Sequence, residues 1–336
     1  MLIYYFFILI CFPLGYAYNK SNENLKKFIM FFYMLSFVAI FGFRYEVGVD
    51  WFNYILAFHR YLDTDFFSSF ELGYKGINYL AYYLGFDIQF VIFFVTVLFV
   101  LFTFLGAKKL ALNPFYFFII IAPFHFIMSG MNYTRQAVAL SIFVFSLSYL
   151  IKGDKYKFLF FIIVAATFHT SALCFIPLFF IEQKKRYSII VLLTILPIII
   201  IKMLNEYSQY TTGTMQSSGF YLRFLFLIIP VIMMLVNYKK ITNIKSLIII
   251  RLFFVSCFSI PFVMFISFIS TTIADRFSYY FILYNVIIYL LVTNNEKRMK
   301  FENIFVIFCS YIGLFTWVTF TRYIHLYEFK YLFFRG

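Results

Sequence analysis

Uncharged and strongly apolar runs, separated by short charged segments, make up most of this chain. A run of about 20 apolar residues is long enough to cross the hydrocarbon core of a bilayer as one helix. The pattern predicts an all-α, polytopic integral membrane protein with about 10–12 transmembrane helices. Prolines inside several runs indicate that some of these helices are short or broken. The runs occupy residues 28–43, 88–107, 110–134, 136–151, 158–181, 187–201, 224–238, 252–274, 277–295 and 303–321.

The composition excludes a large water-soluble domain. Hydrophobic residues make up 64% of the 336 positions, charged residues make up 12%, and the mean hydropathy is +0.90. Soluble domains carry about 25% charged residues on average. We therefore expect residues 1–336 to form a single transmembrane domain. The first sixteen residues lack both a basic segment and a small-residue cleavage site, which predicts a retained first span and not a signal peptide.

The lysines predict how the chain is oriented. Fifteen of the 18 lysines fall in six clusters between the apolar runs. If every cluster faces the cytoplasm, as the positive-inside rule expects, the chain crosses twice between successive clusters and its N-terminus lies outside. This topology leaves a long external loop at about residues 44–86 and a second at about 205–220. The clusters are Lys20/Lys26/Lys27, Lys108/Lys109, Lys152/Lys155/Lys157, Lys184/Lys185/Arg186, Lys239/Lys240/Lys245 and Lys297/Arg298/Lys300.

The run at 158–181 is the hardest to fit to this topology, because it must leave and return between two basic loops. Two short half-helices that meet near His169 would achieve this. Non-helical backbone inside the membrane is tolerated where protein or a wet cavity surrounds it. One ordinary span is the alternative.

The arginines gather on the other side of the membrane in this topology. The positive-inside rule does not predict that excess. A guanidinium binds phosphate through two parallel hydrogen bonds, which lysine cannot do, so an anionic ligand such as a diphosphate is predicted at the outer face. The formal net charge of +14 is therefore not interpreted as a nucleic-acid signature. The outer arginines are Arg44, Arg60, Arg135, Arg223, Arg276, Arg322 and Arg335.

Arg135 is the foremost candidate, with Gln136 beside it, because it interrupts about 40 otherwise uncharged residues. A charge inside a membrane is costly unless it is paired or faces water. Arg276 has a structural alternative as the ion-pair partner of the adjacent Asp275. Arg223 has no acidic neighbour close in the sequence.

The first external loop and one histidine complete the candidate site. Gly48 permits a turn that would bring Arg44 near Asp50 at the membrane surface, with Tyr54 as an interfacial aromatic. The alternative is an arginine at a helix end followed by an aspartate that caps the next helix. His169 lies within an apolar run, and histidine titrates near neutral pH, which suits a general base. A hydrogen-bonded core histidine is the alternative.

The sequence predicts no metal site and no cofactor. Cys11, Cys174, Cys257 and Cys309 all lie in apolar runs without metal-binding spacing, so neither a disulfide nor a zinc site is expected. Asp63-Thr64-Asp65 has the spacing found in metal-dependent sugar transferases. A single match this short is interpreted as a solvated loop.

Five motifs occur in order between about residues 28 and 290. They are Arg44-Tyr45-x-Val47-Gly48-x-Asp50-x-x-x-Tyr54, Glu71-Leu72-Gly73-Tyr74, Arg135-Gln136 followed by Ala137 and Ala139, Phe168-His169-x-Ser171-Ala172, and Arg276 ahead of Tyr279-Tyr280. The ordered set resembles the EpsG family, which comprises Wzy-type polymerases of O-antigen, capsule and exopolysaccharide repeat units. The chain departs from the family at Trp51, where Tyr is frequent, and in the tail around Tyr327–Tyr331, which lacks a Pro-Tyr pair.

The resemblance implies that a growing glycan on undecaprenyl diphosphate is transferred en bloc to a new lipid-linked repeat unit, at the outer face of a bacterial cytoplasmic membrane. It also implies a chain-length regulator as a partner and no cofactor. The leaving diphosphate needs fixed cations, and the attacking hydroxyl needs a base. The predicted diphosphate-binding residues are Arg135, Arg276, Arg44 and Arg223, the further substrate-binding residues are Gln136 and Tyr54, and the catalytic candidates are His169, Asp50 and Arg135.

Three other functions remain open from the sequence. A flippase for lipid-linked oligosaccharides would need a cationic path that opens to both faces. A transferase that uses polyprenyl-phosphate sugars would place acidic residues in its first external loop. An O-antigen ligase would share the donor and differ in its acceptor.

Overall fold

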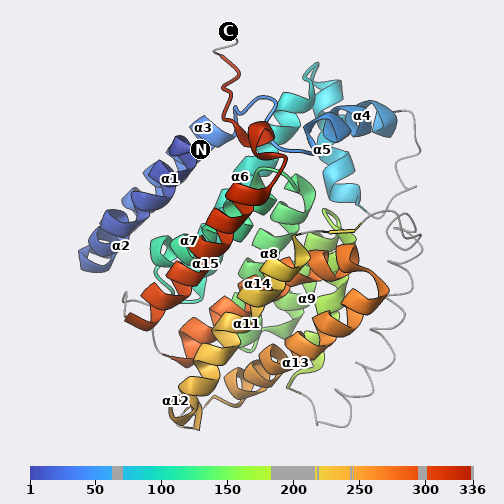
Figure 1. Cartoon of the computed structure of the whole chain (residues 1–336). Coiled ribbons are helices and arrows are strands. Elements are labelled where there is room, and N and C mark those ends of the chain that lie inside the picture. Colours follow the sequence, from blue (N-terminus) through green and yellow to red (C-terminus); the bar gives the residue numbers. More distant parts are fainter. Residues whose placement is uncertain are drawn as a thin grey trace.

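The computed structural model shows an all-helical bundle (Figure 1) and describes residues 1–62, 71–182, 216–217, 219–242, 244, 246–293 and 301–333. The predicted all-α, polytopic membrane fold is confirmed. Within these ranges, six helical segments are long and apolar enough to cross a membrane. They are α1 (Leu2–Leu9) continued by α2 (Cys11–Lys20), α3 (Glu23–Phe41), α6 (Ile88–Lys109), α8 (Thr134–Ile151), α13 (Leu247–Ile269) and α15 (Phe301–Phe320).

The centre of the bundle is formed by α8 and α14 (Thr271–Val292). In α8, 78% of the apolar window is buried inside the protein, against 22% in α3 and 28% in α15. The outer helices carry exposed phenylalanines, as expected of side chains that face lipid rather than water. α14 is 22 residues long and almost entirely buried, although Asp275 and Arg276 lie in its first turns.

Short and broken helices were predicted, and the structure contains them. α7 (Pro114–Ala122) begins at an Asn113 cap, with proline at its first position, where no backbone N–H is needed. At Pro123 it continues into the π-helix η2 (Pro123–Gly130). α11 (Phe220–Val236) is also short for a span and contains Pro230.

The segment around His169 is a pair of half-spans, as one of the two sequence interpretations had it. α9 (Lys155–Ala166) ends before a turn, and the 3-10 helix η3 (Thr170–Phe180) follows it. The rings of Tyr156, near the start of α9, and Phe179, near the end of η3, lie 5.6 Å apart. The two halves are therefore antiparallel neighbours, and His169 sits at their bend.

Lysine clusters that are far apart in the sequence meet at one end of the bundle. The Lys109 ammonium lies 3.4 Å from the Tyr149 ring centroid, and that of Lys157 lies 5.8 Å from it. Lys240 pairs with Glu302, with 3.1 Å between nitrogen and oxygen. This is the end at which α12 (Tyr238–Thr242) lies, and both chain termini lie at the opposite end (Figure 1). Which end faces the cytoplasm stays a prediction. The clusters around Lys184 and Lys297 fall outside the described residues.

The predicted external loop at 44–86 contains two helices, α4 (Trp51–Leu62) and α5 (Leu72–Tyr83). Trp51, Tyr54 and Phe58 recur at helical spacing and form the buried face of α4. An amphipathic helix of this kind lies on the bundle instead of crossing it. Most of the predicted second loop, and Asp63-Thr64-Asp65, lie outside the described residues.

The C-terminal tail binds the first of these segments. The amide of Tyr45 donates to the carbonyl of Lys330, and the amide of Leu332 donates to the carbonyl of Phe43, each at 2.9 Å. The amide of Gly48 donates to Leu326 at 2.8 Å. The tail, whose role the sequence left open, thus holds the segment that carries Arg44 and Asp50.

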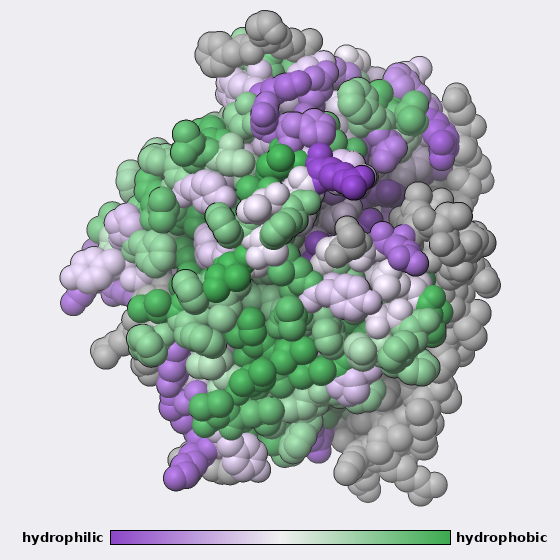
Figure 2. Space-filling model, viewed as in Figure 1, coloured by the Kyte–Doolittle hydropathy of each residue, from purple (hydrophilic) through white to green (hydrophobic). Residues whose placement is uncertain are grey.

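Hydrophobic residues cover the middle of the face seen in Figure 2, over α15, α11 and α14. Hydrophilic residues gather above them, towards the end that carries α4, α5 and the C-terminal tail, where the surface dips inward. This distribution matches an apolar belt in the membrane and a polar end at the water interface.

Candidate functional site

Several helices begin at the polar end of the bundle. Among them are α8 and α14, whose first turns carry Arg135 and Arg276. Helix N-termini present backbone N–H groups and a partial positive charge. An anion held here would therefore meet helix dipoles as well as side chains.

Arg135, in the first turn of α8, pairs with Glu71 at the start of α5. One guanidinium nitrogen lies 2.5 Å from a Glu71 carboxylate oxygen. The Arg135 side chain is 34% exposed, whereas that of Glu71 is 5% exposed. The guanidinium also lies over the rings of Tyr74 and Tyr54, at 5.6 and 6.0 Å from their centroids. The Arg135 side chain is thus partly open to solvent and is surrounded by the Glu71 carboxylate and the rings of Tyr54 and Tyr74.

Arg276 is held against the first turn of α8 from the other side. Its guanidinium lies 3.8 Å from the Tyr133 ring centroid and donates to the side-chain oxygen of Gln136 at 3.1 Å. The Gln136 amide donates back to the Arg276 carbonyl at 2.9 Å. Gln136 therefore links α8 to α14, and Arg135 and Arg276 flank it.

Asp275 pairs with Arg223 of α11. The alternative from the sequence, an ion pair with the adjacent Arg276, is not formed. Arg223 donates to both carboxylate oxygens, from Nη2 at 2.8 Å and also from Nε, and both side chains are buried. Adjacent residues of a helix point in different directions, which separates Asp275 from Arg276. Ser217 donates to the same carboxylate at 3.0 Å. The Arg223–Asp275 pair is thus a buried ion pair that joins α11 to α14.

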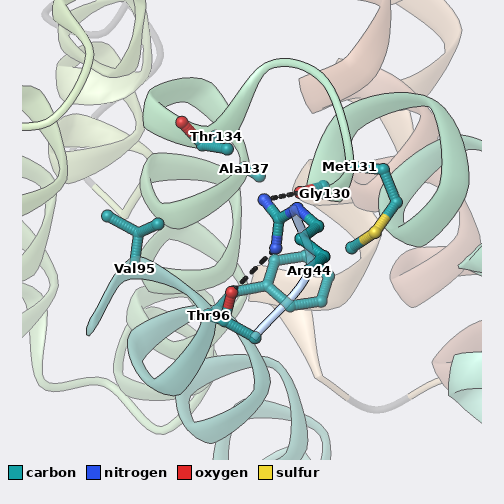
Figure 3. A pocket seen from close by; sticks show the side chains of 8 residues that line it. Arg44, Val95, Thr96, Gly130, Met131, Thr134 and Ala137 are labelled. Atoms are coloured by element: carbon teal, nitrogen blue, oxygen red, sulfur yellow. Dashed lines mark hydrogen bonds between the residues drawn. The ribbon is translucent and has the colours of Figure 1, made fainter. Parts of the chain in front are cut away.

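Arg44 points into the protein rather than to the surface. It is 1% exposed and donates to the carbonyl oxygens of Phe41 and Gly130 and to the Thr96 hydroxyl. Figure 3 shows its guanidinium between Thr96 and Gly130. A cavity of about 10 Å³, room for about one water molecule, lies beside it. A polymer-linked diphosphate cannot enter a space of this size.

The loop after Arg44 is fastened to the start of α8. The Tyr54 hydroxyl donates to the Asn132 carbonyl and accepts from the Thr134 amide, each at 3.0 Å. The amide of Asp50 donates to the Asn132 side-chain oxygen at 2.9 Å. Asp50 itself is partly exposed. The loop thereby places Asp50 beside the turn that leads into Arg135.

His169 faces this cluster from the bend between the two half-spans. Its Nδ1 accepts from the Ser171 amide at 3.3 Å and lies 2.7 Å from the Ser171 hydroxyl oxygen, which contacts the Tyr280 hydroxyl. A backbone amide can only donate, so Nδ1 carries a lone pair and the proton of the neutral ring sits on Nε2. His169 is thus oriented as a hydrogen-bond donor.

Most of the candidates converge, although they come from distant parts of the chain. The charges of Asp50, Arg135 and Arg276 are close enough to act on the Tyr54 hydroxyl. Arg135 and Arg276 also lie within electrostatic range of His169. Arg44 and Arg223 instead face the interior, where Arg44 donates to Thr96 and Gly130 and Arg223 pairs with Asp275. In the described ranges, no group of three His, Cys, Asp or Glu side chains is placed to hold a metal ion.

Two contributors were not among the sequence candidates. Glu71 lies 64 positions before Arg135, so spacing gives no sign of their pairing, although Glu71 opens one of the five motifs. Tyr133 provides the ring on which Arg276 stacks. An aromatic directly before an arginine is too common a pattern to have indicated this.

The chain matches a known protein family. The sequence profile of the EpsG family matches residues 27–333, which is most of the chain and contains every residue of the cluster. No curated protein and no solved structure matches the chain. The chain therefore belongs to the EpsG family, which its ordered motifs resemble.

Proposed function

We propose that this protein polymerises undecaprenyl-diphosphate-linked oligosaccharide repeat units at the outer face of the bacterial cytoplasmic membrane. The membership in the EpsG family supports a polymerase-type role in polysaccharide biosynthesis. The observation that carries the specific proposal is the pair of partly exposed arginines, Arg135 and Arg276, on either side of Gln136 at the end of the bundle opposite the lysines.

The reaction needs stabilisation of the leaving diphosphate. Negative charge develops on the oxygen that leaves the anomeric carbon, and fixed cations lower the energy of that state. Arg135 and Arg276 are placed to share a diphosphate across Gln136, with the helix N-termini behind them. Arg223 and Arg44 act indirectly in this scheme, by fixing α14 and the first loop.

The attacking sugar hydroxyl must also lose a proton. Asp50 and His169 are the sequence candidates for this step. Asp50 is partly exposed, so a sugar hydroxyl can approach it. His169 presents a donor in its neutral form, so it suits a hydrogen bond to the diphosphate or the sugar unless the ring changes its tautomer. No cofactor is needed for either role.

The rival functions differ in where they need positive charge. A flippase would need cations along a path between both faces, whereas the cluster lies at one end of the bundle. A polyprenyl-phosphate-sugar transferase draws some support from Asp50 and Glu71, but Glu71 is engaged by Arg135. An O-antigen ligase would use the same cations and differ only in the acceptor. A protein that regulates chain length is proposed as a partner of the polymerase.

The test is a gel of surface polysaccharide from cells that lack this gene, complemented with wild type, Arg135→Ala or Arg135→Lys. We expect a ladder with wild type and only single repeat units with either variant, because lysine restores the charge without the planar fork. Arg60→Lys, which alters an exposed arginine of α4 outside the cluster, is the matched control and should give a normal ladder.

Accumulation of lipid-linked units inside the null cells, with no single unit at the surface, would contradict the proposal and favour a flippase. A normal ladder with Arg135→Lys would remove Arg135 from the diphosphate site.

A further inference from the structure

The Arg135–Glu71 pair combines features that a purely structural ion pair does not need. Glu71 is buried, with 5% of its side chain exposed, while Arg135 keeps 34% of its side chain exposed at the polar end. A ligand therefore meets the cation first, and the carboxylate lies behind the guanidinium that pairs with it. Arg135 also lies over the rings of Tyr74 and Tyr54, and it donates to the Tyr61 hydroxyl at 3.4 Å. A planar guanidinium can move along such rings while it exchanges partners.

We propose that the diphosphate of the donor lipid takes Arg135 away from Glu71, and that the released Glu71 carboxylate is the base of the polymerase reaction. This inference rests on the proposed function. Diphosphate carries more charge than a carboxylate and accepts two parallel hydrogen bonds from arginine, so it competes well for the cation. A buried carboxylate that loses its cation takes up a proton more readily. Substrate binding thereby switches on the base.

The neighbours of Glu71 fit this role. Glu71 lies within electrostatic range of His169, which is held as a donor by Ser171. His169 can therefore orient an acceptor hydroxyl without competing for its proton. Lys75, one turn along α5, is buried with its side-chain nitrogen 5.7 Å from the Tyr61 ring centroid, so its side chain packs beside the pair.

The chemical step balances with these groups alone. The acceptor hydroxyl oxygen forms a bond to the anomeric carbon of the donor, and its proton passes to the Glu71 carboxylate. The bond from that carbon to the diphosphate oxygen breaks, and its electron pair leaves with the diphosphate, held by Arg135 and Arg276. When the lipid diphosphate departs, Glu71 gives the proton to water and Arg135 pairs with the carboxylate again, which resets the site.

The test separates binding from turnover in purified protein. Undecaprenyl diphosphate is the binding probe, and lipid-linked units extracted from cells without the gene are the substrate for turnover. We expect Glu71→Gln to bind the probe several-fold more tightly than wild type, because Arg135 no longer has a competing partner. We expect its turnover at saturating substrate to fall by about 10²- to 10⁴-fold, the usual contribution of a general base.

Two further variants guard against a folding artefact. Glu71→Asp keeps the charge that Arg135 needs and withdraws the carboxylate by one methylene, so it should fold, bind the probe normally and turn over slowly. Glu46→Gln removes a carboxylate from the exposed pair with Lys330 at the same end and should change neither readout.

Each remaining outcome has one meaning. Normal turnover by Glu71→Gln overturns the proposal. Weaker probe binding together with slower turnover, in both Glu71 variants, also overturns it, because Glu71 would then only position Arg135. Failure of the wild-type protein to extend any lipid-linked unit overturns the proposed function itself, and this inference with it.

Discussion

At the scale of single residues, the buried pair of Arg223 and Asp275 holds the part of α14 that carries Arg276. Both side chains lie inside the bundle, and Ser217 donates to the same carboxylate. Two charges that neutralise each other in this way add little net stability, but removing one leaves the other uncompensated. The pair therefore fixes α11 against α14 at a point one residue from Arg276.

We predict that Asp275→Asn lowers the free energy of unfolding by about 3–5 kcal/mol, because it strands the Arg223 charge in the interior. Thermal melting in detergent measures this loss. Glu23→Gln, in the exposed pair with Lys26, is the control and should leave the melting temperature unchanged. A variant at Asp275 that melts with wild type would show that Arg223 is not dependent on this carboxylate.

Individual candidate residues could be predicted where the surrounding sequence alone shows that a charge is buried at a cost. Arg135 was singled out as a candidate because a cation in a long uncharged stretch is costly unless it is paired or faces water. Its partner Glu71 and the partner of Arg223 could not be found, since pairing across 64 or 52 positions is decided by how helices pack. Arg44 was predicted at the surface, and the structure turns it inward to Thr96 and Gly130.

At the scale of elements, Gly48 is the point at which the first loop crosses the start of α8. Its φ is +101°, a backbone conformation that L side chains rarely adopt. A Cβ atom at this position would lie 2.3 Å from the Met131 carbonyl oxygen. Both the conformation and the close approach require glycine.

We predict that Gly48→Ala lowers stability by more than about 2 kcal/mol and abolishes the polysaccharide ladder, since it lifts the loop from Asn132. Gly85→Ala is the matched control. Gly85 also has a positive φ, +75°, but a Cβ there meets nothing within 4 Å, so only the backbone cost of about 1 kcal/mol applies. Equal losses in the two variants would mean that contact with Met131 is unimportant.

The C-terminal tail supports the same loop from the other side. We predict that a chain ended after Phe329 loses polymer and that its loop around Tyr45 becomes sensitive to protease, because the hydrogen bonds of Lys330 and Leu332 are removed. A chain ended after Phe333 keeps those bonds and should behave as wild type. If both chains make a full ladder, the tail has no part in holding the loop.

Elements were predictable where a periodic pattern or a charge constraint existed. Two basic loops only 24 residues apart made a break near His169 one of two interpretations, and the Tyr156–Phe179 contact decides for the antiparallel halves. The two helices within residues 44–86 were missed, because their many aromatics and short length resemble an interfacial loop. The contact between tail and loop joins positions almost 290 apart and leaves no local signal.

At the scale of the whole molecule, the two ends of the bundle carry different basic residues. Lys109 of α6 and Lys157 of α9 both contact Tyr149 of α8 at one end, and the arginine cluster lies at the other. This arrangement was predictable because lysine clusters separated by two membrane crossings must lie on the same side. The structure confirms it for the clusters around Lys108 and Lys155, whereas those around Lys184 and Lys297 lie outside the described residues.

Orientation in the membrane is the prediction that joins the fold to the function. In a background in which the four native cysteines are replaced, single cysteines at His59 and Tyr323 mark the arginine end, and those at Lys152 and Lys239 mark the lysine end. All four positions are exposed. We expect a membrane-impermeant maleimide to label the first two in intact spheroplasts and the last two only after lysis, because the lysine end is retained in the cytoplasm. The opposite pattern would put the arginines inside, where they could not meet a polymer that grows at the outer face.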